Sequence, residues 1–182
     1  QSTPLQLCMM TAQIANGGYS INPKIVVDNN PLTLHQAKKS MEDQLLHNPN
    51  TKLFKEAKNI KIVQEAMFSS TNERFGTSYR SRIDDPKYQF AGKTGTAQVK
   101  RISKRERELD LELEQIPYKD RDHALYVAYG PYINPRYALS IIVEHGGSGS
   151  RTAAPMAKKL FKLIIDRDEL RNQQSNYEEI SI

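Results

Sequence analysis

The sequence is poor in cysteine, has no tryptophan and contains no long hydrophobic run. Cys8 is the only cysteine among 182 residues, so no disulfide can form within the chain. No apolar run approaches the roughly 20 residues that a membrane-spanning helix requires. A signal peptide is absent as well, because the chain opens directly on a helix signature. A chain that opens in this way is expected to be a piece of a longer protein. We expect Cys8 to be a small packing residue inside the first helix rather than a nucleophile.

The charge is balanced enough to argue against nucleic-acid binding. The chain has 26 basic and 21 acidic residues, for a formal net charge of +5. Proteins that bind nucleic acid usually gather basic side chains on one face, with aromatic residues among them, and the sequence lacks this pattern. The four histidines have no spacing typical of a metal site. We expect one globular unit without a metal or a cofactor.

Periodicity and turn residues predict helices at both ends and strands between them. Thr3 is a suitable N-cap, Pro4 fits the first helical position, and the pair Gly17 and Gly18 should end this first helix. Further segments are predicted as a helix at 58–74, extended chain at 90–99, 124–129 and 136–145, and a helix at 151–170. Because the three extended segments follow one another with hairpin-like connections, we expect an antiparallel sheet.

The same periodicity predicts which side chains are buried. In the helix at 58–74 the expected core residues are Ile60, Val63, Met67 and Phe68. In the final helix they are Ala154, Met156, Leu160, Phe161 and Ile164.

Three segments lack a core pattern. Residues 28–58 and 100–121 are polar or highly charged, and we interpret them as variable insertions, with a possible short helix at Thr33–Leu46. The charged insertion could be simply solvated or could dock a partner protein. Residues 167–182 form a polar C-terminal tail, of which the last twelve residues, 171–182, should be frayed.

The stretch AGKTGTAQV, residues 91–99, allows two interpretations. Gly92-Lys93-Thr94 could end a phosphate-binding loop, but that motif needs a glycine where the chain has Lys87, and a helix after the threonine. The chain continues after Thr94 with glycine and β-branched residues instead. The alternative is a strand carrying the K-T-G signature of penicillin-sensitive serine acyl-transferases. The triplet alone is also compatible with an ordinary strand bearing a surface lysine.

The residue types of the strand suit a carboxylate-bearing peptide. Lys93 offers a fixed positive charge, and the hydroxyls of Thr94 and Thr96 offer donors. Gly95 lacks a side chain, so a peptide or lactam could lie against the strand edge and pair with its backbone. A backbone N–H just past the glycine could point at a developing oxyanion.

Four stretches in this order carry a family resemblance: TPLQLCMMTAQIANGG, AGKTGTAQV, DHALYVAYGPYINPRYALSIIVEHGGSGS and AAPMAKKL. Together they resemble the C-terminal half of class B penicillin-binding proteins, over about residues 3–163. The charged insertion and the DHAL…P…NP run look most like the elongation type, penicillin-binding protein 2. The resemblance implies an α/β fold of the α+β type, shared with serine β-lactamases: a mainly antiparallel sheet flanked by helices. Residues 1–166 would be the C-terminal part of the transpeptidase domain.

The resemblance also implies a function and a location. This family consists of inner-membrane proteins whose periplasmic D,D-transpeptidase domain cross-links peptidoglycan stem peptides and is acylated by β-lactams. Lys93, Thr94, Gly95 and Thr96 would bind the D-Ala-D-Ala donor, with Lys93 and Thr96 in catalytic roles and the Thr96 amide in the oxyanion hole. Rod-shape morphogenesis proteins are possible partners. Any membrane anchor would precede this chain.

Two of the three family motifs are missing. No serine has a lysine three residues later, and the nearest case is Ser148 with Arg151. S-x-N occurs at Ser20 and at Ser70, but both follow the first helix, whereas the family motif precedes it, so we interpret both as accidental. Because acyl transfer needs an activated serine, we expect this chain alone to be inactive. The alternative is a degenerate, non-catalytic scaffold protein with the same fold.

Two other features allow a functional and a structural interpretation. His123, beside Asp122, could be a base, but we favour a hydrogen-bonded or capping role. Gly146, Gly147 and Gly149 could border a substrate groove, but we favour a plain, flexible turn.

Overall fold

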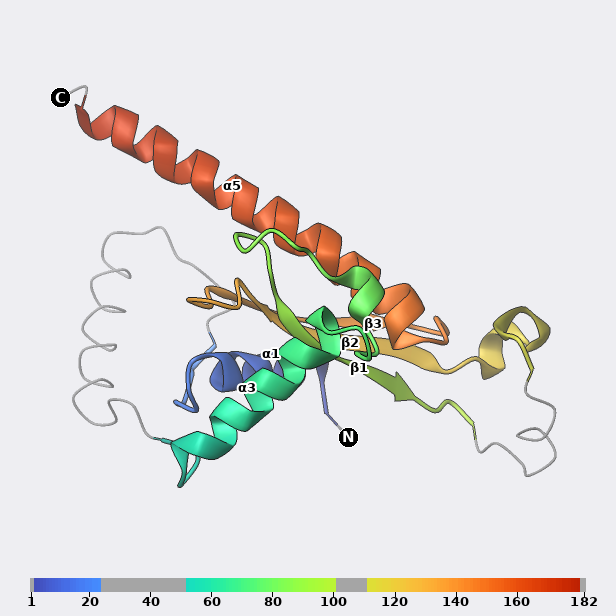
Figure 1. The fold of residues 1–182 in the computed structure, drawn as a ribbon. Coiled ribbons are helices and arrows are strands. Elements are labelled where there is room, and N and C mark those ends of the chain that lie inside the picture. Colours follow the sequence, from blue (N-terminus) through green and yellow to red (C-terminus); the bar gives the residue numbers. More distant parts are fainter. Residues whose placement is uncertain (1, 24–51, 101–110, 181–182) are drawn as a thin grey trace, which may run out of the picture.

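A three-stranded antiparallel sheet forms the centre of the molecule (Figure 1). The structure is a computed structural model that describes residues 2–23, 52–100 and 111–180, with side chains up to residue 170. The strands are β1 (Ala91–Ala97), β2 (His123–Gly130) and β3 (Tyr137–Val143), in the order β1-β2-β3. This confirms the three predicted strands and their antiparallel connection. The register pairs Gly95 with Leu125 and Tyr126 with Ile141.

Helices cover both faces of the sheet. Helix α5 (Ala154–Ile180) lies on one face, while α1 (Pro4–Ala15) and α3 (Ala57–Asn72) lie on the other (Figure 1). Alternation along β2 explains this, because successive side chains of a strand point to opposite faces. Ala124, Tyr126 and Ala128 pack toward α5, and Val127 and Tyr129 toward α1 and α3.

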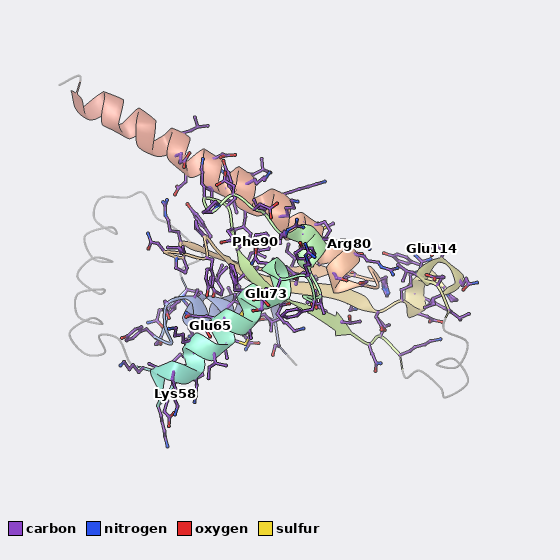
Figure 2. All side chains as sticks on the ribbon, viewed as in Figure 1. Lys58, Glu65, Glu73, Arg80, Phe90 and Glu114 are labelled. Carbon is purple, nitrogen blue, oxygen red and sulfur yellow. The ribbon has the colours of Figure 1, made fainter. Side chains whose placement is uncertain are left out.

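The core under α5 is built around two stacked rings. Phe90, just before β1, lies where the sheet and α5 meet (Figure 2), and its ring centroid is 4.9 Å from that of Phe161 on α5. Both side chains are fully buried, with Tyr126 edge-on to Phe90. Fully buried aromatic side chains contribute several kcal/mol each. Phe161 therefore anchors α5 to the sheet.

The first helix begins and ends as predicted. The Thr3 side chain accepts a hydrogen bond from the Gln6 N–H at 3.2 Å, and the Gln6 side chain accepts from the Thr3 N–H at 2.8 Å. This reciprocal pair is a capping box. After Ala15 the chain turns through Gly17 and Gly18, whose φ values of 88° and 93° favour glycine.

The buried face of α5 agrees with the prediction at Ala154 and Phe161 and differs from it at the other positions. Its buried residues are Ala154, Ala157, Phe161 and Ile165, whereas Met156 and Leu160 are 44% and 40% exposed and Ile164 is only half-buried. The two alanines at the contact let the helix axis approach the sheet closely. Larger side chains at these positions would keep the helix farther away. On α3, Ile60 and Met67 are buried as predicted, but Val63 is exposed.

The two insertions and the C-terminal stretch also bear on the predictions. The predicted helix at 33–46 and most of 28–58 lie outside the described residues, while α3 already begins at Ala57. In the charged insertion, residues 111–121 contain two short 3₁₀ turns, Leu113–Gln115 and Tyr118–Asp120. The frayed tail predicted at 171–182 is wrong for residues 171–180, because α5 continues to Ile180 and extends away from the sheet (Figure 1).

Candidate active site

The K-T-G triplet lies in β1, at one edge of the described sheet. Side chains of a strand alternate between its two faces, so Lys93 and Gly95 lie on the same face as buried Ala91. This is the face covered by α1 and α3. Thr94 and Thr96 belong to the opposite face. Because the triplet sits in the middle of a strand rather than before a helix, the phosphate-loop interpretation is excluded, as predicted.

Helix α3 covers only the first half of the outer edge of β1. The Asn72 side-chain amide donates to the Phe90 carbonyl at 2.9 Å, and the Thr71 hydroxyl donates to the Gly92 carbonyl at 3.4 Å. The next carbonyl of the same parity, that of Thr94, accepts from Lys93 Nζ at 2.9 Å. Alternate residues of an antiparallel strand direct N–H and C=O to the same side. The N–H and C=O of Thr96 therefore face the second half of this edge, which α3 and the other described helices leave uncovered.

A buried cluster of hydroxyl groups fixes α3 to the sheet. The Tyr126 hydroxyl lies 2.9 Å from Thr71 Oγ1 and 3.1 Å from Ser78 Oγ, and burial raises the pKa of Tyr126. The ring reaches this position beneath Gly92, where an added Cβ would lie 2.4 Å from the tyrosine oxygen. Gly92 is therefore required by packing, independently of any substrate.

A second, more exposed row of polar groups runs along the same edge. Ser70 Oγ is 3.2 Å from Thr77 Oγ1, which is 3.2 Å from Thr94 Oγ1, and Lys93 Nζ is 3.5 Å from that same oxygen. The structure thus brings Lys93 and Thr94 together and adds Thr77, which the sequence analysis missed. Thr77 stands in an irregular turn with no motif around it, and only its approach to Thr94 distinguishes it.

A groove of about 590 Å³ is lined by Thr96, near the end of β1. Its wall includes Asp122 of the segment before β2 and Gly147, Ser148 and Thr152 of the segment after β3. Residues 146–149 connect β3 to α5, as predicted, and a role of this segment beside a substrate groove stays a prediction. The segment borders this groove and leads into a π-helical turn, Gly149–Ala153.

Gly149 is packed tightly against the K-T-G strand. It is buried, and a Cβ added to it would lie 2.4 Å from the Leu125 carbonyl oxygen and 2.7 Å from that of Gly95. Any side chain here would push the turn away from β1. The turn therefore packs directly against the K-T-G strand at Gly95, the last residue of the triplet.

Two predicted structural roles are confirmed. His123 Nδ1 accepts a hydrogen bond from the His145 N–H at 2.9 Å. The Cys8 thiol donates to the Ala138 carbonyl at 3.4 Å, and partial burial raises its pKa, which disfavours the nucleophilic thiolate. Within residues 2–23, 52–100 and 111–180, no three His, Cys, Asp or Glu side chains are grouped in a way that could hold a metal ion.

Comparisons with known proteins agree on the family. Residues 1–162 match the family described as the penicillin-binding protein transpeptidase domain. The chain is 29% identical to the peptidoglycan D,D-transpeptidase MrdA of Salmonella typhimurium (strain LT2), over 91% of this chain and 25% of that protein. It is 31% identical to MrdA of Haemophilus influenzae, over 91% of this chain and 24% of that protein.

Solved structures give the same result. Penicillin-binding protein 2 of Helicobacter pylori, solved in complex with MreC, matches with a TM-score of 0.62 and 29% identity, over 89% of this chain and 25% of that one. Penicillin-binding protein 2 of Pseudomonas aeruginosa matches with a TM-score of 0.58 and 30% identity, over 89% and 30%. The chain thus spans about a quarter of the length of the relatives it matches. The predicted fold is confirmed, and the chain belongs to the penicillin-binding protein transpeptidase family, with similarity to penicillin-binding protein 2.

Proposed function

We propose that this chain is the C-terminal part of a peptidoglycan D,D-transpeptidase domain and supplies one wall of its active site. The observation that carries the proposal is the half-open edge of β1, where Lys93, Thr94 and Thr96 are exposed or half-buried beyond the end of α3. An edge strand with free N–H and C=O groups can pair with an extended peptide. A cation and two hydroxyls beside that edge suit a peptide that ends in a carboxylate.

In this proposal the donor stem peptide lies along the uncovered half of β1. Lys93 and the hydroxyls of Thr94 and Thr96 hold its terminal carboxylate, and Gly95 lets the two backbones approach. The Thr96 N–H, which shares the outward parity of Gly92 and Thr94, points at the carbonyl oxygen that becomes the oxyanion. A β-lactam, which carries a carboxylate and an acyl bond in similar positions, would occupy the same edge.

The chemistry requires a serine that lies outside this sequence. Its oxygen attacks the carbonyl between the two D-alanines, its proton passes to a base, and the terminal D-alanine leaves with its amine protonated. The amine of a neighbouring stem peptide then attacks the acyl-serine, which forms the cross-link and releases the serine. Because no S-x-x-K motif occurs among the 182 residues, we propose that this chain alone cannot form the acyl-enzyme.

We also propose the cellular setting of these relatives. The Helicobacter pylori neighbour was solved with MreC, so a morphogenesis protein is the partner class we expect for the full-length protein. We place the domain in the periplasm, attached to the inner membrane through a segment outside this chain. No helix in the described part of the chain has the length and apolar content needed to cross a bilayer.

The role of Lys93 is tested in the full-length protein. Replacing Lys93 with Ala should lower the second-order rate of acylation by a fluorescent penicillin by about two orders of magnitude, because a charge-assisted bond to the carboxylate is lost. Lys61→Ala, which removes another exposed lysine from α3, is the matched control and should leave the rate unchanged. An unchanged rate in Lys93→Ala would refute the assignment. If the full-length protein has no acylated serine at all, the scaffold alternative is correct.

A further inference from the structure

Three hydrogen bonds hold the segment that connects β3 to α5 against the first residue of β2 and the two residues before it. The His145 N–H donates to His123 Nδ1 at 2.9 Å, and the Gly147 N–H donates to the Asp122 carbonyl at 2.8 Å. His145 Nδ1 lies 3.0 Å from the Arg121 carbonyl. Among residues 121–123, only His123 contributes a side chain to these bonds, while the other two contribute backbone carbonyls.

These partners determine where the two imidazole protons reside. A carbonyl oxygen can only accept, so His145 carries its proton on Nδ1. His123 Nδ1 faces an N–H group and must be a bare acceptor, which leaves its proton on Nε2. The rings lie edge to face with centroids 4.9 Å apart, and the Tyr118 ring also packs on His145, with centroids 4.8 Å apart. His123 is thus a neutral acceptor in a defined orientation.

The connecting segment needs such support because its glycine-rich backbone has many accessible conformations. Residues 146–149 contain three glycines, which lose more conformational entropy on ordering than other residues do. His145 itself has a φ of 56°, in the left-handed region that is unfavourable for a residue with a side chain. The hydrogen bond to His123 is made by the backbone of this strained residue, immediately before the glycines.

The position of this segment matters to the proposed active site. Gly149 packs on the Gly95 backbone so closely that an added Cβ would lie 2.7 Å from the Gly95 oxygen. The next residue of β1, Thr96, lines the groove together with Gly147 and Ser148. A shift of the segment would therefore move or loosen the residue whose N–H is proposed to stabilise the oxyanion, and such donors work only when held in place.

We propose that His123 is a positioning residue of the transpeptidase site. Its Nδ1 accepts the hydrogen bond that holds residues 145–149 against the backbone of Gly95. This contact in turn keeps the Thr96 amide in place. His123 touches neither the substrate nor the reacting atoms in this proposal. The inference rests on the proposed function of β1 and assigns to that site a residue outside the K-T-G strand.

The test uses three substitutions in the full-length protein and the acylation rate with a fluorescent penicillin. His123→Asn places an amide oxygen near the position of Nδ1, His123→Gln places it one carbon farther away, and His123→Leu removes the acceptor. Since one hydrogen bond contributes about 1 kcal/mol, Leu and Gln should slow acylation about fivefold or more, and Asn should stay within about twofold of the wild type. The thermal midpoint of each variant is measured alongside.

The outcomes separate this inference from the proposed function. Wild-type rates in both Leu and Gln, or a rate for Asn as low as for Leu, would overturn the role of His123. If Leu fails to fold, the comparison of Asn with Gln decides alone, and equal rates overturn the inference. Lys93→Ala is run in parallel: if it leaves acylation unchanged, the proposed function of β1 fails, whereas a loss in Lys93→Ala with no effect of His123 variants rejects only the positioning role.

Discussion

The Thr77 hydroxyl lies 3.2 Å from the Thr94 hydroxyl, and this contact joins the turn after α3 to the K-T-G strand. Thr94 can rotate about its Cα–Cβ bond, so a partner at this distance selects one orientation of its oxygen. The proposed carboxylate site therefore depends on a residue 17 positions upstream of Thr94 in sequence.

The first prediction concerns this contact. Thr77→Val keeps the shape and removes the hydroxyl, and it should slow acylation of the full-length protein by penicillin about threefold to tenfold, the effect of one net hydrogen bond. Thr77→Ser keeps the hydroxyl and is the matched control, with an expected rate close to that of the wild type. Equal rates for Val and Ser would show that Thr94 needs no partner.

The second prediction separates two glycines of the same strand. Gly92→Ala would place a methyl group 2.4 Å from the Tyr126 hydroxyl, in a buried cluster, and should destabilise the protein by about 1–3 kcal/mol. In Gly95→Ala the nearest neighbour of the new methyl group is Leu125 Cβ, at 3.3 Å, so the effect on unfolding should be small.

The acylation rate, unlike stability, should be the property that Gly95→Ala changes. The Gly95 methyl group would stand on the face of Lys93, where the donor peptide must approach, so Gly95→Ala should lower the acylation rate while the protein stays folded. Thermal unfolding and acylation are measured on both variants. A Gly95→Ala protein that unfolds as readily as Gly92→Ala would contradict the assignment of separate roles.

Local signals explain what the sequence could predict. The cap at Thr3, the glycines at 17 and 18 and the three strands depend on short-range preferences, and each is present in the structure. The K-T-G strand could also be recognised, because its motif consists of consecutive residues.

Tertiary contacts explain what the sequence could not predict. Thr77 and His123 owe their places to partners at Thr94 and His145, and no local pattern records such pairings. The prediction for the buried face of α5 was wrong at Met156 and Leu160 for a related reason. The sheet accepts the small Ala157 at close range beside Ala154 and Phe161, while the larger Met156 and Leu160 stay exposed.

The third prediction tests which face of α5 is buried. Phe161 is fully buried against Phe90, so Phe161→Ala should lower the free energy of unfolding by about 3–5 kcal/mol. Leu163, two residues away on the same helix, is 66% exposed, and Leu163→Ala should change that free energy by less than about 0.5 kcal/mol. Chemical denaturation of both variants checks the pair. Similar losses for both would mean that the far side of α5 is also covered by protein.

The fourth prediction concerns this chain by itself. Of the two S-x-N serines, Ser20 is exposed after α1, and Ser70 has the Thr77 hydroxyl as its hydrogen-bond partner, which cannot take its proton as a base would. No base is hydrogen-bonded to either serine within the described residues, so we expect neither to be an activated nucleophile. The purified 182-residue chain should carry no fluorescent penicillin after denaturation, while the full-length protein treated in the same way should be labelled. A label on the chain that survives denaturation and maps to Ser20 or Ser70 would contradict the proposal that the nucleophile lies outside this sequence. It would also make the hydroxyl row of Ser70, Thr77 and Thr94 the first place to look for the missing base.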